Sequence, residues 1–497
     1  MILCRYCYDT MELADIIKVL QPMRVIGRGK GLIKGLTYDS RLVMKDYLFA
    51  AIQGSELNGL DFIDDALQRG ATAIITETEI DPPMNATVIV VKDARNALAR
   101  VANAFHRYPS SCLDVVGITG TNGKTTTSYL IRDVLTADLR RPGLIGTVAY
   151  EFGDRMLPAS RTTPEAPELQ AMLDQMRDVG CRSAVMEVSS HALDQQRVAG
   201  IEFDVAVFTN LTQDHLDYHE DFESYFKAKA TLFTGLSKKS GHAIINIDDP
   251  WGERLAAMPE ICAKVITYGF TEHAMVRAHS VQLDDDGSTF MLTSPWGSSD
   301  VRIKLMGRFN VSNALAAIAA CASMGVDFDQ VINHIELVAS VPGRLETIPS
   351  KVGQVYVDYA HTDDALSNVL TTLKELVRGR LICVFGCGGN RDVDKRPKMA
   401  AVAQDLADFT IVTSDNPRRE SPASIIKDVV AGFTEASGYR VVEDRQAAIA
   451  AGIEMLEKDD ILLIAGKGHE NYQEVGQSVI PFDDREVARQ LLQARNL

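Results

Sequence analysis

The chain has 497 residues, of which 46% are hydrophobic and 24% are charged, values typical of soluble globular proteins. At about 150 residues per domain, this length predicts about three domains. Lys and Arg number 51 and Asp and Glu number 67, which gives a net charge of −16. An acidic chain is a poor binder of nucleic-acid backbones, because that affinity comes from basic side chains. We therefore expect no nucleic-acid partner.

Cysteine usage and hydropathy predict a cytoplasmic protein. The eight cysteines are scattered along the chain, as is typical of reduced thiols. Cys4 and Cys7 form a CxxC pair, but with no second pair or nearby His we expect no zinc site. The longest apolar stretch, 314–326, has 13 residues, whereas a membrane span needs about 20. Since the N-terminus also lacks a basic region followed by an apolar core, we expect neither a leader peptide nor a membrane span.

Three regions follow one another along the chain, and each alternates apolar runs with helical patterns. Such alternation predicts α/β domains with largely parallel sheets. In the first region the predicted elements are strands at 47–52, 73–76 and 87–91 and a helix at 94–107. In the second they are strands at 113–119, 184–188 and 203–209 and helices at 225–233 and 314–326. In the third they are strands at 354–360, 381–386, 409–414 and 461–466, with helical stretches between several of them.

The third region has the pattern of a doubly wound sheet, in which ligands bind at the carboxyl ends of the strands. Three of its strands lead into polar loops at 386–398, 415–419 and 466–470. With a linker at 108–111 and a break near 342–343, the three predicted domains are 1–110, 111–342 and 343–497.

The strongest chemical signal follows the strand at 113–119. Gly120, Gly123, Lys124 and Thr125 form the pattern G-x-x-G-K-T before a helical stretch. Glycines let backbone N–H groups approach phosphate oxygens, a helix N-terminus and a lysine stabilise the phosphate, and a threonine hydroxyl can bind Mg²⁺. Ile118 stands where the usual G-x-x-x-x-G-K-[ST] pattern has its first glycine. A plain strand–helix turn is the alternative, but the strand–loop–helix context favours nucleotide binding.

Acidic and imidazole side chains follow two further strands. Glu187 interrupts an apolar run near a strand end, where it is either a metal ligand or a salt-bridged glutamate. Two Asp and two His lie within 214–219 after the next strand, which suits metal or phosphate chemistry but also an ordinary loop. From its spacing alone, Lys229 is a residue of a solvated helix face.

Ten motifs stand in order along the chain: GITGTNGKTTT (117–127), EVSSHAL (187–193), TNLTQDHLDYH (209–219), YFKAKATLF (225–233), GRFNVSNALAA (307–317), VPGRLE (341–346), DYAHTDDAL (358–366), GCGGNRDVDKRPKM (386–399), SDNPR (414–418) and GKGHENYQ (466–473). In this order they resemble the Mur ligases of peptidoglycan synthesis, a family that also uses the shifted glycine spacing. The resemblance spans about residue 37 to the C-terminus. The set is most similar to the member that adds the third amino acid, meso-2,6-diaminopimelate.

The resemblance implies an α/β fold of three domains. The first would be a small α/β domain that binds the uridine end of the substrate. The second would be a central P-loop domain with a parallel sheet that binds ATP. The third would be Rossmann-like and would bind the incoming amino acid. These roles fit the domain boundaries given above.

The resemblance also implies the reaction. The side-chain carboxylate of D-Glu in UDP-MurNAc-L-Ala-D-Glu attacks the γ-phosphate of ATP, and the amine of meso-diaminopimelate then displaces phosphate from the acyl phosphate. Phosphorylation supplies the leaving group that a carboxylate lacks, and positioning and charge neutralisation do the rest. We expect ATP and two Mg²⁺ ions as cofactors and a monomeric enzyme.

The resemblance assigns the chemistry to particular residues. Lys124, Glu187, His215 and Lys229 would be catalytic. Thr125 and Glu187 would bind one Mg²⁺ and His215 a second, and Lys229 would carry a carbamate from CO₂ (N6-carboxylysine), an anion that binds metal where an ammonium would repel it. The implied ATP-binding residues are Gly120, Thr121, Asn122, Gly123, Lys124, Thr125, Thr126, Asn310, Arg344, Asp358 and His361.

The two other substrates are assigned in the same way. The implied contacts of the UDP-MurNAc-dipeptide are Ser40, Thr162, Thr163, Ser189, Gln195 and Arg197. The implied contacts of diaminopimelate are Arg396, Asp415, Asn416, Pro417, Arg418, Gly466 and Glu470. A guanidinium fork suits the far carboxylate of diaminopimelate, which lysine lacks, and Glu470 would accept from the far ammonium. Without the family, the residue types at 415–418 favour a polar turn after a strand, and only the family context reverses that interpretation.

Alternatives and one departure stay open at this point. Asp363 stands where the family usually has proline, and an aspartate there could cap a helix. The glycine run at 386–389 lacks the full dinucleotide spacing, so we do not expect NAD. The alternative functions are a lysine-adding Mur ligase, a ligase similar to folylpolyglutamate synthetase, a plain P-loop NTPase and a catalytically silent nucleotide-binding regulator.

Overall fold

The computed structural model describes residues 10–54, 57–81, 85–216, 218–236 and 240–495. Cys4, Cys7 and Asp217 therefore lie outside the described residues. The chain forms two compact units. The first comprises Met1–Gly117, Arg140–Ala206 and Thr231–Gly241, and the second comprises Ile118–Leu139, Val207–Ala230 and His242–Leu497.

The first unit opens with a five-stranded sheet in the order β2-β7-β6-β5-β4. All its pairs are parallel except β2 with β7. Leu48 and Phe49 are adjacent in β5 and enter separate apolar cores, so helices cover both faces of this sheet. Its elements are β1 (Met11–Glu12), α1 (Leu13–Leu20), β2 (Arg24–Ile26), β3 (Leu32–Ile33), β4 (Gly35–Thr37), η1 (Ser40–Leu42), β5 (Tyr47–Ala50), η2 (Gly59–Phe62), α2 (Ile63–Gln68), β6 (Ala71–Thr76), β7 (Thr87–Val90), α3 (Ala94–Phe105) and η3 (Pro109–Cys112).

The remainder of the first unit pairs strands in the order β11-β10-β9-β12. Only β9 and β12 are parallel. Its elements are β9 (Pro142–Ile145), β10 (Ala149–Phe152), β11 (Arg155–Pro158), α5 (Ala166–Asp178), β12 (Ser183–Glu187) and α6 (Ser190–Asp194). Three elements pass from one unit into the other, namely β8 (Asp114–Thr119), β13 (Val205–Phe208) and α7 (Phe222–Thr234).

The second unit begins with the helix that follows the glycine loop. Strands β14, β15 and β16 are parallel, and β16, β17 and β18 continue as antiparallel hairpins. Helix α9 is buried on almost every side, as the apolar run at 314–326 predicts. These elements are α4 (Lys124–Ala137), β14 (His242–Asn246), α8 (Pro250–Ala256), β15 (Lys264–Gly269), β16 (Val276–Asp284), β17 (Gly287–Ser294), β18 (Gly297–Ile303), α9 (Arg308–Ser323) and α10 (Phe328–Leu337).

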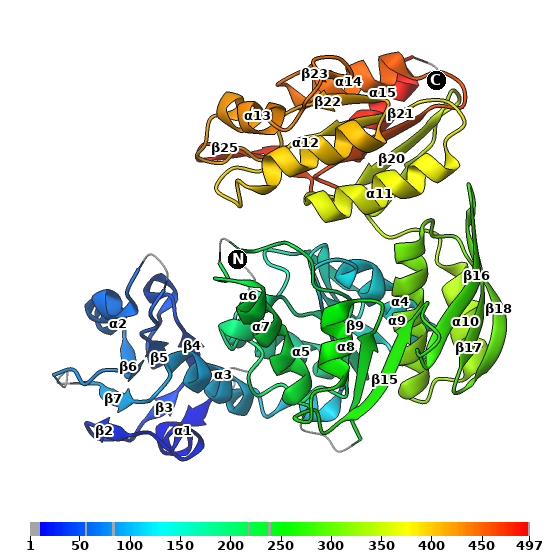
Figure 1. The fold of residues 1–497 in the computed structure, drawn as a ribbon. Coiled ribbons are helices and arrows are strands. Elements are labelled where there is room, and N and C mark those ends of the chain that lie inside the picture. Colours follow the sequence, from blue (N-terminus) through cyan, green and yellow to red (C-terminus); the bar gives the residue numbers. More distant parts are fainter. Residues whose placement is uncertain (1–9, 55–56, 82–84, 217, 237–239, 496–497) are drawn as a thin grey trace. The chain divides into compact units, whose positions relative to one another are not determined.

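The C-terminal part of the second unit is a six-stranded sheet in the order β19-β20-β24-β21-β22-β23. It is parallel except for β19. Side chains of β21 and β24 alternate between two cores, one under α11, α12 and α13 and one under α14 and α15 (Figure 1). This confirms the predicted doubly wound sheet. Its elements are β19 (Glu346–Ile348), β20 (Gln354–Asp358), α11 (Asp363–Leu376), β21 (Leu381–Phe385), α12 (Lys395–Leu406), β22 (Phe409–Val412), α13 (Pro422–Val430), β23 (Tyr439–Val441), α14 (Arg445–Met455), β24 (Ile461–Ala465), β25 (Tyr472–Val475), β26 (Ser478–Pro481) and α15 (Asp484–Ala494).

The structure confirms the predicted strands and helices and adds others, among them the parallel strands β14 and β15 and the antiparallel hairpins. One local expectation is wrong. Thr362, not Asp363, caps α11, and its hydroxyl accepts from the N–H of Ala365 at 3.2 Å. Asp363 is the first helical residue, where a carboxylate is favourable to the helix dipole. Within the described ranges no helix is both long and apolar enough to cross a bilayer.

Candidate active site

At two positions of the glycine loop, the backbone has a conformation that favours glycine. Gly120 has φ +151° and Gly123 has φ +86°, values that residues with a Cβ rarely adopt. A Cβ at Gly120 would lie 1.8 Å from Oγ1 of Thr209, and one at Gly123 would lie 2.4 Å from Oδ1 of Asn313. The loop is therefore packed so closely that its backbone, not side chains, forms its surface.

Lys124 begins α4 and turns its side chain back over the loop. Its Nζ donates to the carbonyl oxygens of Gly120 at 2.9 Å and Thr121 at 2.8 Å. The hydroxyl of Thr125 accepts from Arg344 at 2.9 Å, and Thr126 is buried. The predicted loop residues thus hold a fixed positive charge next to the N-terminus of a helix, as a phosphate site requires.

The strand β13 supplies loop supports that the sequence analysis did not single out. The hydroxyl of Thr209 donates to the carbonyl of Asn122 at 2.6 Å, and the side chain of Asn210 accepts from the N–H of Asn122 at 2.9 Å. Both residues open the motif TNLTQDH, so the signal was present but was assigned to the residues that follow. Asn122 also donates to Asp364 at 2.7 Å.

Asn310 and Arg344, both predicted ATP-site residues, line one cavity. Its volume is about 230 Å³, and Lys304, Met306 and Glu346 also line it. Asn310 is buried and donates to the carbonyl of Met306 at 2.8 Å. The cavity is therefore lined by both polar and cationic side chains next to the predicted phosphate loop.

His361 and Arg344 both lie against the ring of Tyr359, which follows Asp358 in the chain. The guanidinium of Arg344 lies 4.6 Å from the ring centroid of Tyr359. Asp358 accepts from the N–H groups of Leu345 and Ala360, both at 2.7 Å. Burial raises the pKa of Asp358, opposed by Arg344. Burial, assisted by Lys395, lowers the pKa of His361 to about 4, so this imidazole is neutral at physiological pH.

His215 and Lys229 follow β13 in the same unit. His215 has φ +55° and is 40% exposed, with Nε2 3.4 Å from Asp214. Burial raises the pKa of Asp214, but His215 and His361 outweigh that effect and lower it. Lys229 is only 1% exposed, with Nζ 4.4 Å from the ring centroid of Tyr225. The prediction of a solvated face is therefore wrong for Lys229, which spacing alone could not distinguish from a buried residue.

Glu187 ends β12 in the first unit and is fully buried. Its carboxylate accepts from the backbone N–H and the hydroxyl of Thr147, both at 2.9 Å. A Cβ at Gly146 would lie 2.4 Å from its Oε1. Thr147 thus holds the carboxylate in one orientation, as hydrogen-bonded carboxylate ligands of metals are held.

Most of the predicted dipeptide contacts come together beside Glu187. The hydroxyl of Thr163 donates to the carbonyl of Glu187 at 2.8 Å and accepts from the N–H of Ser189 at 3.1 Å. Arg197 donates to the carbonyl of Thr163 at 2.9 Å and to Gln195 at 2.7 Å. The hydroxyl of Thr162 lies 3.0 Å from that of Thr147. Ser40 lies apart in η1, where it is hydrogen-bonded to Asp65.

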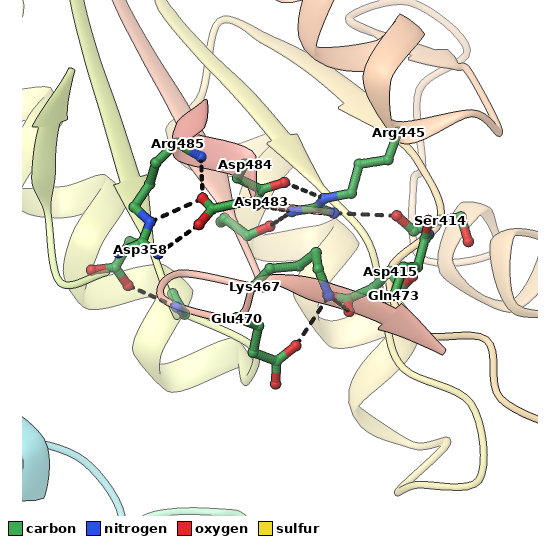
Figure 2. A network of polar contacts seen from close by, with 12 residues as sticks. Asp358, Ser414, Asp415, Arg445, Lys467, Glu470, Gln473, Asp483, Asp484 and Arg485 are labelled. Carbon is green, nitrogen blue, oxygen red and sulfur yellow. Dashed lines mark hydrogen bonds and ion pairs between the residues drawn. The ribbon is translucent and has the colours of Figure 1, made fainter. Parts of the chain in front are cut away.

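The predicted amino-acid site forms at the carboxyl ends of β22 and β24 (Figure 2). Asn416 donates to Glu470 at 2.8 Å. Lys467, which the sequence analysis did not assign, donates to both Asn416 at 3.1 Å and Glu470 at 3.0 Å, and is fully buried. Burial raises the pKa of Glu470, opposed by Lys467 and reinforced by Asp415. Two acids and one lysine thus give this cluster a net negative charge when all are ionised.

Arg418 and Gly466 complete this edge of the sheet. Arg418 follows Pro417 with φ +52°, and its guanidinium donates to the carbonyl of Gly389 at 2.9 Å and pairs with Glu474 at 2.7 Å. It remains 25% exposed. Gly466 has φ +117°, and a Cβ there would lie 2.6 Å from Oδ2 of Asp415. The glycine therefore permits the close approach of the two loops.

Arg396 is the predicted diaminopimelate residue that has least room for a ligand. Its side chain is 1% exposed, and its guanidinium pairs with Asp428 at 2.8 Å and Glu420 at 2.9 Å. Arg396 lies in the first turn of α12, whereas Arg391 lies in the loop before that helix and is exposed. The Cβ position at Gly388 lies 3.0 Å from NH1 of Arg418 and 3.9 Å from Cγ of Arg391. The motif NRDVDKR contains both arginines, and sequence alone does not tell which one is accessible.

Comparisons with known proteins agree with this fold. The chain matches "Mur ligase family, catalytic domain" over residues 32–106, "Mur ligase middle domain" over 118–321 and "Mur ligase, glutamate ligase domain" over 343–468. Two relatives carry the name UDP-N-acetylmuramoyl-L-alanyl-D-glutamate–2,6-diaminopimelate ligase. The one from Geobacter sulfurreducens is 46% identical, covering 96% of this chain and 98% of the relative. The one from Geobacillus thermodenitrificans is 43% identical, covering 98% and 100%.

Solved structures give the same result. A structure with the same ligase name is 34% identical, with a TM-score of 0.70, and covers 98% of this chain and 100% of the other. The Mycobacterium tuberculosis folylpolyglutamate synthase complexed with ADP and AMPPCP is 20% identical, with a TM-score of 0.62, and covers 79% and 94%. At that identity the likeness shows the fold alone.

A glycine loop that opens a helix, together with a doubly wound C-terminal sheet, defines an α/β nucleotide-binding protein of the ligase type. The chain belongs to the Mur ligase family, whose members are ATP-dependent amide-forming ligases. The alternatives of a plain NTPase and a folylpolyglutamate-type ligase are not favoured.

Proposed function

We propose that this chain is the ATP-dependent ligase that joins meso-2,6-diaminopimelate to the D-Glu side-chain carboxylate of UDP-MurNAc-L-Ala-D-Glu in peptidoglycan synthesis. The preference for diaminopimelate is inferred from the side chains that follow β22 and β24. There Asn416, Lys467 and Glu470 form one buried polar cluster, and Arg418 lies on the same loop. An acid cluster with a neighbouring guanidinium suits an ammonium and a carboxylate on one carbon, which the far end of diaminopimelate has and lysine lacks.

The reaction proceeds in two displacements. A carboxylate oxygen of D-Glu attacks the γ-phosphorus of ATP, and the bond to the β–γ bridging oxygen breaks to release ADP. The amine of diaminopimelate then attacks the acyl carbon, the bond to the phosphate oxygen breaks, and the amine loses a proton. The chain contributes mainly positioning and charge neutralisation, as in other phosphoryl transfers.

The glycine loop is assigned to ATP. Its backbone N–H groups and the fixed ammonium of Lys124 would bind the phosphates, and Asn310 and Arg344 would line the nucleotide cavity. Asp358 and His361 would close the nucleotide site. Bound Mg²⁺ neutralises the phosphate oxygens during transfer, and it is usually held by one or two protein carboxylates together with substrate phosphates. Thr125, Glu187 and His215 are the proposed protein ligands.

Lys229 is assigned to the carbamate. The amine must be neutral to attack CO₂, in the step Lys–NH₂ + CO₂ → Lys–NH–COO⁻ + H⁺. Burial, assisted by Lys124, lowers the pKa of Lys229 well below its ordinary value, which favours the neutral amine. The carbamate would replace a buried amine with an anion that can hold Mg²⁺. ¹³C-bicarbonate labelling should give a carbamate carbon resonance that is absent in Lys229→Arg.

The remaining contacts follow the same logic. Thr162, Thr163, Ser189, Gln195 and Arg197 would bind the muramoyl-dipeptide and Ser40 the uridine end. Asp415 and Pro417 would shape the amino-acid loop. The proposed enzyme acts as a cytoplasmic monomer.

Isotope transfer tests the proposed function directly. With both oxygens of the D-Glu side-chain carboxylate labelled with ¹⁸O, attack on ATP must carry one ¹⁸O into the released phosphate. Mass spectrometry should therefore find one ¹⁸O per phosphate in the presence of diaminopimelate. Release of unlabelled phosphate would mean that water attacks ATP, and the chain would then be a plain NTPase.

A further inference from the structure

Arg445 is a fully buried cation that the proposed chemistry does not use. It is the first residue of α14, and its side chain has 0% exposure. Its Nε and NH2 donate to the two carboxylate oxygens of Asp484, both at 2.7 Å. Asp484 is the first residue of α15 and is also fully buried. The pair therefore joins the N-termini of two helices beneath the C-terminal sheet.

The same guanidinium also holds two backbone carbonyls. NH1 donates to the carbonyl of Ser414 at 3.2 Å, and NH2 donates to that of Ala465 at 2.9 Å (Figure 2). Ser414 lies directly before the loop 415–418, and Ala465 lies directly before the loop 466–470. One side chain thus fixes the starting points of both loops that form the proposed amino-acid site.

Two further observations place Arg445 against that site. The Cβ position at Gly466 lies 2.6 Å from Oδ2 of Asp415 and 3.7 Å from NH2 of Arg445, so the guanidinium lies next to the close approach of the loops. A cation at a helix N-terminus is disfavoured by the helix dipole, and burial of a charge is costly. Arg445 is therefore a costly side chain for packing alone, whereas a guanidinium, with its five N–H donors, can satisfy all four of these acceptors at once.

We infer that Arg445 is a positioning residue for the incoming amino acid. By holding the carbonyls of Ser414 and Ala465, it sets the separation between the Asp415–Arg418 and Gly466–Glu470 loops, and so the distance between Arg418 and Glu470. Arg445 itself touches no substrate. The identity of the amino acid rests on the proposed function, but the positioning of the two loops does not.

Arg445→Lys tests the inference because it keeps the charge and loses the fork. Arg380→Lys is the matched control. Arg380 pairs with Asp460 at 2.7 Å and donates to the carbonyl of Met455 at 2.6 Å, but it precedes β21 and so lies at the amino ends of the strands. Arg445→Leu combined with Asp484→Leu is the second variant. It removes both charges, which a fold tolerates better than one unpaired buried charge.

We expect changes in two measured quantities, the amide hydrogen exchange of the two loops and the KM for diaminopimelate. In Arg445→Lys, amide hydrogen exchange should become faster in peptides spanning 414–419 and 465–471, and not in the remaining peptides of the sheet. The KM for diaminopimelate should rise about tenfold, while the KM values for ATP and for UDP-MurNAc-L-Ala-D-Glu stay within about twofold. Arg380→Lys should leave the exchange of both loops and all three KM values unchanged.

The inference would be overturned by wild-type exchange in both loops of Arg445→Lys or the double variant, or by equal rises in all three KM values. If the wild-type chain itself does not use diaminopimelate, the proposed function fails. The exchange of the two loops then decides the positioning role by itself.

Discussion

Three arginines near the proposed amino-acid site differ in burial, and burial determines which of them can bind a substrate carboxylate. Arg391, Arg396 and Arg418 all belong to motifs shared with the family, and each could meet a carboxylate. The structure separates them, because Arg396 is paired with Glu420 and Asp428 while Arg391 is exposed near Arg418. The burial and pairing of Arg396 depend on residues 24 and 32 positions away, which the motif does not contain.

We therefore expect Arg391 and Arg396 to behave differently. Because Arg391 is the exposed arginine of this motif, we propose that it meets a carboxylate of diaminopimelate. Arg391→Ala should then raise the KM for diaminopimelate about tenfold, because it removes a charge-assisted contact, and should leave the melting temperature within about 1 °C of wild type. Arg396→Ala should lower the melting temperature by about 5 °C, because two acids lose their partner. Steady-state kinetics and thermal melts of both variants check this. A larger KM effect in Arg396→Ala would restore Arg396 as the ligand contact.

Glu187→Gln tests the metal role of a carboxylate that Thr147 holds in place. The substitution keeps the shape of the side chain and removes its charge. We expect kcat/KM to fall at least about 100-fold and the Mg²⁺ concentration for half-maximal rate to rise, with an unchanged melting temperature. Rate measurements across a Mg²⁺ series decide it, and a wild-type Mg²⁺ dependence would argue against metal binding by Glu187.

At the scale of elements, the fully buried parallel strands of the C-terminal sheet were predictable, whereas the parallel strands β14 and β15 and the antiparallel hairpins were not predicted. Strands such as β21 and β24 are buried on both faces and read as continuous apolar runs. Strands β16, β17 and β18 bury one side, and their residues alternate between buried and exposed. A search for apolar runs therefore passes over them.

The turn between β8 and α4 carries a prediction for glycine. Gly123→Ala should lower kcat/KM for ATP at least about tenfold, because a Cβ at φ +86° would meet Oδ1 of Asn313. Gly325→Ala is the control. Gly325 has φ +81°, and nothing lies within 4 Å of its Cβ position. It should cost about 1 kcal/mol of stability and leave ATP kinetics unchanged. If both variants lowered kcat/KM for ATP equally, the cause would be backbone strain at positive φ and not the contact with Asn313.

Asp460, at the amino ends of β21 and β24, should make the stability of the protein depend on pH. Burial acts to raise the pKa of Asp460, but hydrogen bonds from Arg380 and Glu457 lower it overall. Asp460 therefore contributes stability that is complete above its unfolded pKa, near 3.9, and is lost as the pH falls through the lower folded value. Asp460→Asn should lower the melting temperature by about 3 °C at pH 7.

The difference between wild type and Asp460→Asn should shrink as the pH falls from about 5 to about 3. Thermal melts of both proteins over this range measure it. A difference that stays constant with pH would mean that Asp460 acts through packing and not through its charge.

At the scale of the whole molecule, the family and its chemistry were readable because ten motifs stand in a fixed order. Because ligands bind at the carboxyl ends of parallel strands, the sequence also predicted which loops would bind them. The sequence did not predict the residues that hold the loops of the site in place. Arg445 and Asp484 are 39 residues apart and belong to no motif, and Lys467 lies inside one without revealing its partners. Such residues become visible only when the fold brings them under the site.

The central claim is that this chain selects diaminopimelate over lysine. The most direct measurement is phosphate release and product mass with ATP, Mg²⁺ and UDP-MurNAc-L-Ala-D-Glu, comparing meso-diaminopimelate with L-lysine at equal concentrations. We predict release with diaminopimelate only, with one tripeptide formed per phosphate, because the far end of lysine carries no carboxylate for Arg418 to bind. An equal or faster rate with lysine, or release with neither amino acid, would contradict the account.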